Sequence, residues 1–361
     1  METAYLVLGN GKIFKGKHIG APGKCVGELV FTTNMEGYLE TLTDPSYAGQ
    51  IVIQTFPLIG NYGVIEEDFE GKSALKGYVV REICGTPSNF RSQYQLDEYL
   101  KKHGIPGICG VDTRELTRMI REEGVMNAMI CSRVPKNLSA VKEFAVTKVV
   151  DAVSCREKVL YPPQGEKKHT VVLIDYGAKK NIIRSLTKRG CEVITVPSTT
   201  TAEKVLNCKP DGIMLSNGPG DPVENTFAIA QIKKLIGKVS IFGICLGHQL
   251  TALAMGGRTE KLKYGHRGGN QPVKEAGGRT YITSQNHGYA VIAESLKGTG
   301  VETFVNANDG SCEGMEYPGR RCFTVQFHPE ACAGPKACAG PKDTGFLFDR
   351  FIAMMEGQDN A

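Results

Sequence analysis

The sequence predicts a two-domain α/β protein, with a β-rich α+β domain over residues 1–150, a linker over 151–168, and a doubly wound, mostly parallel sheet over 169–361. Three observations carry this prediction. The length of 361 residues suits two domains. A polar, proline-containing stretch, residues 160–169, separates two halves of different texture. After this stretch, apolar runs alternate with helical segments, which is typical of βαβ units.

The first half contains short strand-like runs separated by turn signals. Gly9-Asn10-Gly11 predicts a hairpin, because Asn and Gly readily take positive φ. Asp112 is the expected N-cap of a helix that stops before Gly124. The expected strands are 5–8, 13–14, 28–33 and 50–56, and the expected helices are 96–103 and 113–123.

The second half repeats a strand–turn–helix rhythm. Residues 171–174 form a continuous apolar run, as expected for a strand buried on both faces. The other expected strands are 192–196, 212–215 and 239–243, and the expected helices are 181–188, 202–207, 227–235 and 346–355. Ligands of open parallel sheets bind at the carboxyl ends of the strands, so the loops there are where chemistry is expected.

Composition excludes several classes of protein. Hydrophobic residues make up 41% and charged residues 22%, which is typical of a globular chain. A net charge of +5 without a basic block indicates neither a nucleic-acid nor a membrane partner. No apolar run approaches about 18 residues and no signal peptide is recognised, so we expect a cytoplasmic protein. The twelve cysteines lack C-x-x-C pairs and zinc-type spacing, so we expect free thiols and no metal site.

One cysteine stands out by its context. Gly243-Ile244-Cys245-Leu246-Gly247 joins an apolar strand to a helix, in the manner of the Gly-x-Ser-x-Gly turn that presents a nucleophile. A helix N-terminus there would stabilise a thiolate. The pentapeptide by itself fits a buried cysteine in a glycine-flanked turn equally well, so a partner base is needed to decide.

His328 is the candidate base. It ends an apolar run and is followed by Pro329 and Glu330, which fits the sequence of nucleophile, base and orienting carboxylate. Alone, His-Pro-Glu is more often an ordinary loop. His248 lies on the same predicted helix as Cys245, so a packing or solvated role is the better prediction for it.

Two polar loops fit the same cleft. Residues 216–222, with two glycines, follow a strand and can offer backbone N–H groups to an oxyanion, although a simple Gly/Pro turn is the better explanation of this loop taken alone. Residues 285–289 are expected between strand-like segments, where amide and backbone groups can bind a polar substrate.

Four ordered motifs in the second half resemble the class I (triad-type) glutamine amidotransferases: SNGPGDP (216–222), FGICLGHQL (242–250), SQNHGYA (284–290) and QFHPE (326–330). The first half narrows the family. Residues 29–63 and 107–130 are similar to the small chain of carbamoyl-phosphate synthases, and with DYGAKKNIIRSL (175–186) the resemblance covers nearly the whole chain.

The resemblance implies roles for individual residues. Cys245 attacks the carboxamide of glutamine, His328 moves the proton, and Glu330 orients His328. Gly220 and Leu246 are implied to offer backbone N–H groups to the oxyanion. The positions that match the family's glutamine-holding residues are Ser46, Gly218, Gly220, Leu246, Gln249, Asn286, Gly288 and Tyr289. Tyr289 is often Phe in the family, and a main-chain contact would survive that change.

The resemblance also implies a partner. In the family, ammonia passes to a separate large chain that makes carbamoyl phosphate, a precursor of arginine and pyrimidines, from bicarbonate with ATP. This sequence has no G-x-x-x-x-G-K-[ST] loop, so we expect no cofactor on it and expect ATP and Mg²⁺ on the large chain, in a heterodimer or a higher assembly. Two alternatives stay open: an amidotransferase subunit serving another ammonia-using synthetase, and a non-catalytic regulatory subunit.

One segment departs from the family pattern. The hexapeptide Ala-Cys-Ala-Gly-Pro-Lys occurs twice in succession, at 331–336 and 337–342, directly after Glu330. Loop-closure entropy grows slowly with length, so a surface loop accommodates such an insertion. The repeat is expected to lengthen the loop beside the candidate cleft, where it could alter partner binding.

Overall fold

The computed structural model describes residues 2–331 and 343–358 and divides into two compact units, Met1–Thr147 and Lys148–Ala361. Apart from Ala331, the repeated hexapeptide lies outside the described residues. The sequence suggested a linker over residues 151–168, but this segment is partly regular structure. It contains the end of helix α5 (Val149–Val153) and strand β8 (Val159–Tyr161), which pairs antiparallel with β10 (Cys191–Pro197). An edge strand exposes unpaired backbone groups, and β8 covers those of β10.

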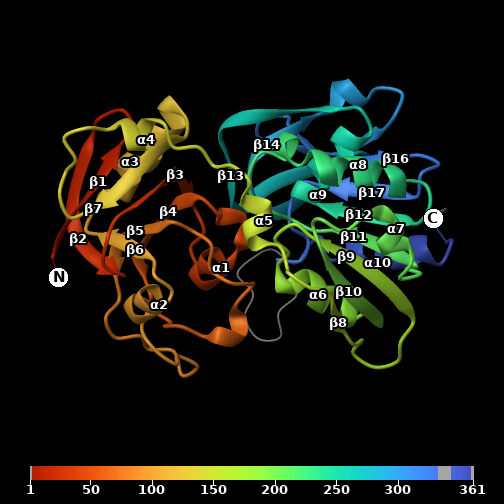
Figure 1. Cartoon of the computed structure of the whole chain (residues 1–361), viewed down its shortest axis with the longest axis horizontal. Coiled ribbons are helices and arrows are strands. Elements are labelled where there is room, and N and C mark those ends of the chain that lie inside the picture. The colour runs from red at the N-terminus through yellow and green to blue at the C-terminus, as the bar shows by residue number, and fades with distance from the viewer. Residues whose placement is uncertain (1, 332–342, 359–361) are drawn as a thin grey trace. The chain divides into compact units, whose positions relative to one another are not determined.

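The first unit is a closed barrel of seven strands (Figure 1). Around the barrel the strands are β1 (Thr3–Leu8), β2 (Ile13–Gly20), β6 (Pro106–Cys109), β5 (Gly77–Ile83), β4 (Gln50–Ile59), β3 (Cys25–Thr32) and β7 (Met126–Cys131). Its helices are α1 (Tyr38–Thr43), α2 (Leu96–Lys102), α3 (Thr113–Glu123) and α4 (Ser139–Lys142). A barrel removes sheet edges, and this closure was not foreseen from the separate strand-like runs.

Local signals in the first unit act as the sequence indicated. β1 and β2 form an antiparallel hairpin, in which Gly11 takes a φ of 92°. The Asp112 carboxylate accepts a hydrogen bond of 2.9 Å from the Glu115 N–H and caps α3. Gly124, with a φ of 93°, ends that helix.

The second unit is built on a ten-stranded sheet. Its centre is parallel and consists of β10, β9 (His169–Asp175), β11 (Gly212–Leu215), β12 (Ser240–Ile244) and β17 (Cys322–Val325), in that order. The flank beyond β17 is antiparallel and consists of β16 (Cys312–Tyr317), β15 (Val301–Asn306), β13 (Arg258–Glu275) and β14 (Thr280–Ile292). The α/β class is as predicted, but the parallel part is confined to these five strands.

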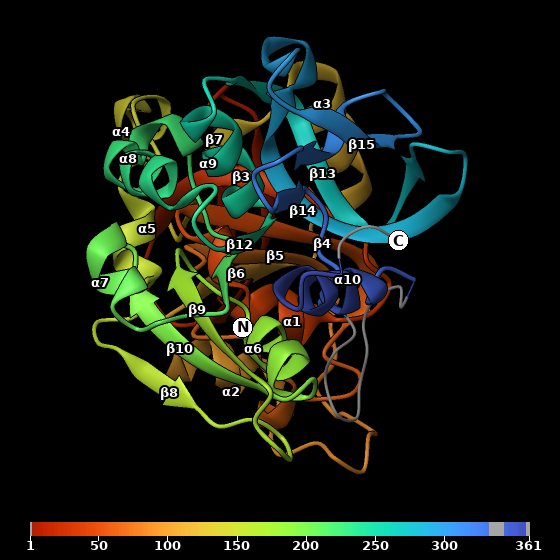
Figure 2. The ribbon, with the colours of Figure 1, turned by 90° about the vertical axis from the view of Figure 1, so that its right-hand side faces the viewer.

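Helices cover both faces of the parallel centre (Figure 2). Val171 and Leu173 pack on the side of α6 (Lys180–Thr187) and α10 (Phe346–Met355). Val172 and Ile174 pack on the opposite side, with α7 (Ala202–Leu206), α8 (Thr226–Leu235) and α9 (Leu246–Ala254). Successive residues of a strand point to opposite faces, so a continuous apolar run is what a doubly wound sheet requires.

The polar segment 285–289 lies inside strand β14, not between two strands as the sequence suggested. β13 and β14 pair antiparallel with register shifts between Lys261 and His266 and between Gly268 and Gln271. Such irregularities bend a strand and re-aim its side chains, which is how a polar segment fits within the pairing.

In the described ranges, no helix has the length and apolar character needed to cross a membrane.

Candidate active site

Cys245 occupies a strained turn between β12 and α9. Its φ of 52° and ψ of −103° lie outside the regions that non-glycine residues favour, and it is the N-cap of α9. The Cys245 N–H donates to the Val325 carbonyl at 2.8 Å, which holds the turn against β17. The side chain is almost fully buried. The thiol thus sits at the N-terminus of a nine-residue helix, at the carboxyl edge of the sheet.

The flanking glycines are required by close packing. A Cβ at Gly247 would collide with the Leu215 carbonyl, and one at Gly243 would lie 2.9 Å from Thr324 Cγ2. The Gly247 N–H also donates to the Ser216 carbonyl at 3.1 Å. Any larger residue would therefore push α9 away from β11.

His328 and Glu330 form a buried pair just beyond β17. The His328 Nδ1–H donates to Glu330 Oε1 at 2.7 Å, and neither side chain is exposed. The other ring nitrogen, Nε2, makes no hydrogen bond of good geometry with the described residues. Since Nδ1 is engaged by the carboxylate, Nε2 is the atom available for proton exchange.

The electrostatics place a proton on His328. Burial and Lys179 lower its pKa, but Glu330 and the Cys245 side chain outweigh them and raise the pKa to about 9. The Cys245 contribution means that the thiol lies close to the ring, although no well-aligned hydrogen bond joins them. Such contacts often tighten only when substrate binds. The pKa of Glu330 is lowered despite its burial, because His328 and Lys179 stabilise its charge.

Lys179 is a site residue that the sequence did not single out. Its Nζ lies 3.6 Å from Glu330 Oε1, and the residue is largely buried. Asn217 Oδ1 accepts a hydrogen bond of 3.1 Å from the Lys179 N–H, and Asn217 Nδ2 donates to the Gly177 carbonyl at 2.9 Å. The loop that follows β9 is thereby fastened to the loop that follows β11. A lysine at the carboxyl end of a strand was the available signal, but most lysines there are solvated.

Strand β14 forms another wall of the site. The Cys245 thiol faces the Asn286 carbonyl, with an Sγ–O distance of 3.8 Å. One turn along α9, Gln249 Nε2 donates to the Tyr289 carbonyl at 2.8 Å and to Gln326 Oε1 at 3.0 Å. The backbone of β14 therefore contacts both Cys245 and the helix that begins after it.

All but one of the sequence-predicted residues lie in the second unit. Cys245, Leu246 and Gln249 lie in or next to α9, Asn286, Gly288 and Tyr289 in β14, Gly218 and Gly220 in the loop after β11, and His328 and Glu330 after β17. Ser46 belongs to the first unit, where it is buried in the 3₁₀ turn Pro45–Tyr47 and its N–H donates to Asp44 Oδ1 at 2.9 Å.

His248 has a packing role. It is fully buried, and its Nδ1 lies 2.8 Å from Thr324 Oγ1. Burial lowers its pKa to about 3, so the ring is neutral at physiological pH. The solvated alternative for this residue is therefore wrong.

Comparisons with known proteins identify the family. Residues 6–130 match the family model of the carbamoyl-phosphate synthase small chain, CPSase domain, and residues 172–354 match that of the class I glutamine amidotransferases. The chain is 52% identical to the carbamoyl phosphate synthase small chain of Fusobacterium nucleatum, over 98% of both chains. It is 51% identical to the pyrimidine-specific small chain of Bacillus subtilis, over 97% of this chain and 95% of that one.

The chain belongs to the carbamoyl-phosphate synthase small-chain family. Its second unit is a class I glutamine amidotransferase domain, so the chain is the glutamine-hydrolysing subunit of such a synthase. A solved glutamine amidotransferase of Thermotoga maritima also resembles the chain, with a TM-score of 0.40 and 16% identity over 53% of this chain and 85% of that one.

Proposed function

We propose that Cys245, His328 and Glu330 carry out the hydrolysis of glutamine in this member of the carbamoyl-phosphate synthase small-chain family. The observation that carries the proposal is the strained, buried thiol at the start of α9, beside a histidine that Glu330 holds by a 2.7 Å hydrogen bond. Because the pKa of His328 is about 9, its ring carries a proton at neutral pH that it can give to the departing nitrogen, and the thiol proton of Cys245 then replaces it.

The chemistry follows from that arrangement. The Cys245 sulfur attacks the side-chain carbonyl carbon of glutamine, and a tetrahedral oxyanion forms. His328 gives its proton to the amide nitrogen as the C–N bond breaks, which releases ammonia and leaves a γ-glutamyl thioester. Water then attacks the thioester, with His328 accepting its proton, and glutamate leaves. Glu330 keeps the imidazole oriented and stabilises its charged form.

Backbone groups are suited to hold the oxyanion. Leu246 is the first residue of α9, so its N–H has no acceptor within the helix. Gly220, in the loop after β11, takes a φ of 88°, a conformation that favours glycine. We assign these two groups to the oxyanion. The proposed glutamine-holding set is Ser46, Gly218, Gly220, Leu246, Gln249, Asn286, Gly288 and Tyr289.

The partner is part of the proposal. Ammonia passes to a carbamoyl-phosphate synthase large chain, which binds ATP and Mg²⁺ and makes carbamoyl phosphate, while this chain needs no cofactor. The first unit is assigned to docking that partner in a heterodimer. A cytoplasmic location stays a prediction, which the free thiols of the described cysteines support.

The test combines one substitution with two nitrogen sources. The complex of this chain with a large chain should make carbamoyl phosphate from glutamine or from free ammonia. Cys245→Ser should abolish synthesis from glutamine and leave synthesis from ammonia intact. Persistence of glutamine-driven synthesis in C245S would show that Cys245 is not the nucleophile. Failure of any large chain to stimulate hydrolysis would favour another synthetase as the partner.

A further inference from the structure

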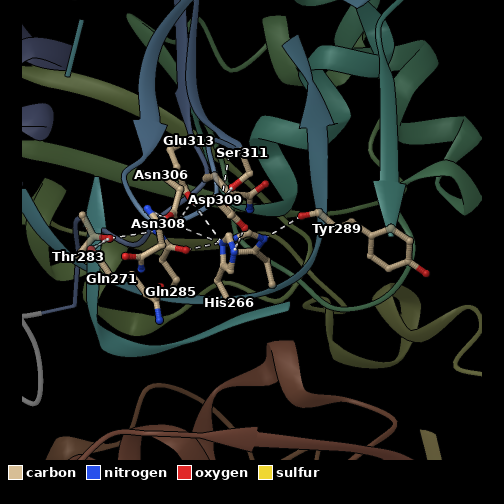
Figure 3. Close-up of polar contacts among 12 residues, drawn as sticks. His266, Gln271, Thr283, Gln285, Tyr289, Asn306, Asn308, Asp309, Ser311 and Glu313 are labelled. Carbon is tan, nitrogen blue, oxygen red and sulfur yellow. Dashed lines mark hydrogen bonds and ion pairs between the residues drawn. The ribbon is translucent and has the colours of Figure 1, made fainter. Parts of the chain in front are cut away.

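Three metal-ligating side chains gather in the antiparallel flank of the second unit (Figure 3). His266 of β13, His287 of β14 and Glu313 of β16 each bring one ligand atom to within 4.8 Å of the other two. All three residues are buried, and His266 Nδ1 lies 3.5 Å from Glu313 Oε1. A tetrahedral zinc site places its nitrogen and oxygen donors about 3.4 Å apart, so this pair already has the spacing of one edge of such a site.

One ring nitrogen of each histidine is engaged by an acceptor outside the cluster. The His266 Nε2–H donates to Asp309 Oδ2 at 2.8 Å, and the His287 Nδ1–H donates to the Tyr289 carbonyl at 2.8 Å. A carbonyl can only accept, so a proton of His287 is fixed on Nδ1. The nitrogens left to bind a cation are therefore His266 Nδ1 and His287 Nε2. Metal-ligating histidines have this arrangement, in which a carboxylate or a backbone carbonyl holds the other ring N–H.

The contact between Gln285 and His287 points to a cation. The Thr283 hydroxyl donates to the Gln271 carbonyl at 2.9 Å, so it accepts from Gln285 Nε2 at 3.2 Å. This turns Gln285 Oε1 toward His287 Nε2, at 3.1 Å. Burial lowers the pKa of His287 well below its ordinary value, so the ring is neutral and Nε2 carries a lone pair. Two lone pairs then face each other in the protein interior, and a cation bound by both atoms removes their repulsion.

Glu313 supplies a negative charge for such a cation. It is fully buried, and its Oε2 makes no hydrogen bond with the residues that the structure describes. Burial raises the pKa of Glu313. Burial lowers the pKa of His266, but Glu313 and Asp309 outweigh it and raise that pKa. A proton therefore binds this pair when no metal does, and zinc, which binds the deprotonated groups, displaces it.

We propose that His266, His287 and Glu313 bind one zinc ion, which holds β13, β14 and β16 together. Gln285 Oε1 takes the fourth position, and two imidazoles with two oxygens suit zinc in tetrahedral geometry. The ion is structural and takes no part in the hydrolysis of glutamine, so its binding goes beyond the proposed function and does not depend on it. The sequence predicted no metal site because the ligands come from three separate strands and show no zinc-type spacing.

The first measurement is the zinc affinity of the untagged full chain, stripped with a chelator and titrated with Zn²⁺. We expect one tight site per chain. His266→Gln and Glu313→Gln should each weaken it about 100-fold or more, because loss of an outer partner alone costs about 10–100-fold. Asp309→Ala, at a half-exposed position, should weaken it about 10-fold and serves as the test if the buried variants do not fold. His169→Gln is the matched control: His169 pairs with Glu356 at 3.2 Å in the same unit, and zinc binding should not change.

The second measurement identifies the ligands. The chain loaded with Co²⁺ should show the visible absorption of a tetrahedral site with nitrogen and oxygen ligands, without the charge-transfer band of a thiolate. Zinc at about 100 times its Kd should raise the melting temperature of the parent by about 5–10 °C, and the same concentration should leave that of H266Q nearly unchanged.

Three results would overturn the proposal. The first is a parent chain that titrates no zinc, and the second is an unchanged zinc affinity in the variants of His266, Glu313 and Asp309. The third is a thiolate band in the cobalt spectrum, which would place the metal on a cysteine. Cys245→Ser should keep the zinc site, so glutamine hydrolysis that survives in C245S refutes the proposed function and leaves the zinc site standing.

Discussion

The proton on His328 is the feature of the proposed mechanism that is most open to measurement. In the folded chain its pKa is about 9, above the ordinary value of about 6.5. The extra protonation therefore exists between pH 6.5 and 9 and is lost as the pH rises through about 9. Glu330→Gln removes the carboxylate whose charge and hydrogen bond both raise this pKa.

The size of the effect follows from what remains around the ring. Without Glu330, burial and Lys179 still lower the pKa of His328 and the Cys245 side chain still raises it, so we expect the pKa to fall to about 6.5. At pH 8 a histidine of pKa about 9 is ~90% protonated and one of about 6.5 is ~3% protonated. Loss of the general acid alone then lowers kcat/KM ~30-fold, and loss of ring orientation adds to it.

The assay is the pH profile of glutaminase kcat/KM from pH 6 to 10 for the parent and two variants. The alkaline limb, near pH 9 in the parent, should move by about two units or more to lower pH in E330Q. Lys179→Met should move it the opposite way, since Lys179 lowers the pKa of His328. Unmoved limbs in both variants would refute the assignment of the proton to His328.

Three further predictions concern stability. Gly247→Ala should lower the melting temperature by several degrees because its Cβ meets Leu215, whereas Gly85→Ala, with open space around it, should leave it nearly unchanged. Asp112→Ala should reduce the free energy of unfolding by about 1 kcal/mol in urea titrations, and Asp112→Asn by much less, because only the asparagine can still cap α3. His248, with a folded pKa of about 3, should make the chain less stable as the pH falls from 6.5, by up to about 1.4 kcal/mol per pH unit, and His248→Gln should lessen that slope. An equal slope in H248Q would contradict the neutral, buried ring.

The sequence was most informative where the physical signal is local. The strands and helices of the βαβ centre were predicted to within about two residues, because a buried parallel strand reads as one apolar run. The turn at Cys245 could also be predicted from the sequence, because its flanking glycines are required by the close approach of neighbouring backbone. The flank was not: β13 carries polar and glycine residues and shifts its register, so no period-2 pattern marks it as a strand.

Contacts between residues that are far apart in the sequence could not be predicted from it either. Lys179 and Glu330 lie 151 residues apart in sequence, and they follow strands β9 and β17, which belong to the same parallel centre with β11 and β12 between them. The His266–Glu313 pair has the same character, since it joins β13 to β16 across the antiparallel flank. Lysine, histidine and glutamate are common residues on protein surfaces, so only their burial in the folded chain marks these pairs as unusual.

The pairing of β12 with β17 has a consequence for how the length of this chain can vary. Ile244 and Val325 are register partners, and the Cys245 N–H binds the Val325 carbonyl. The nucleophile and the base therefore both follow this pair of residues closely in sequence, each on its own strand. One residue added to either strand would slide Cys245 out of step with His328. Residues added after Glu330 do not change the pairing of Ile244 with Val325. The duplicated hexapeptide comes after Glu330, so the register between β12 and β17, which positions Cys245 and His328, is independent of how often the hexapeptide is repeated.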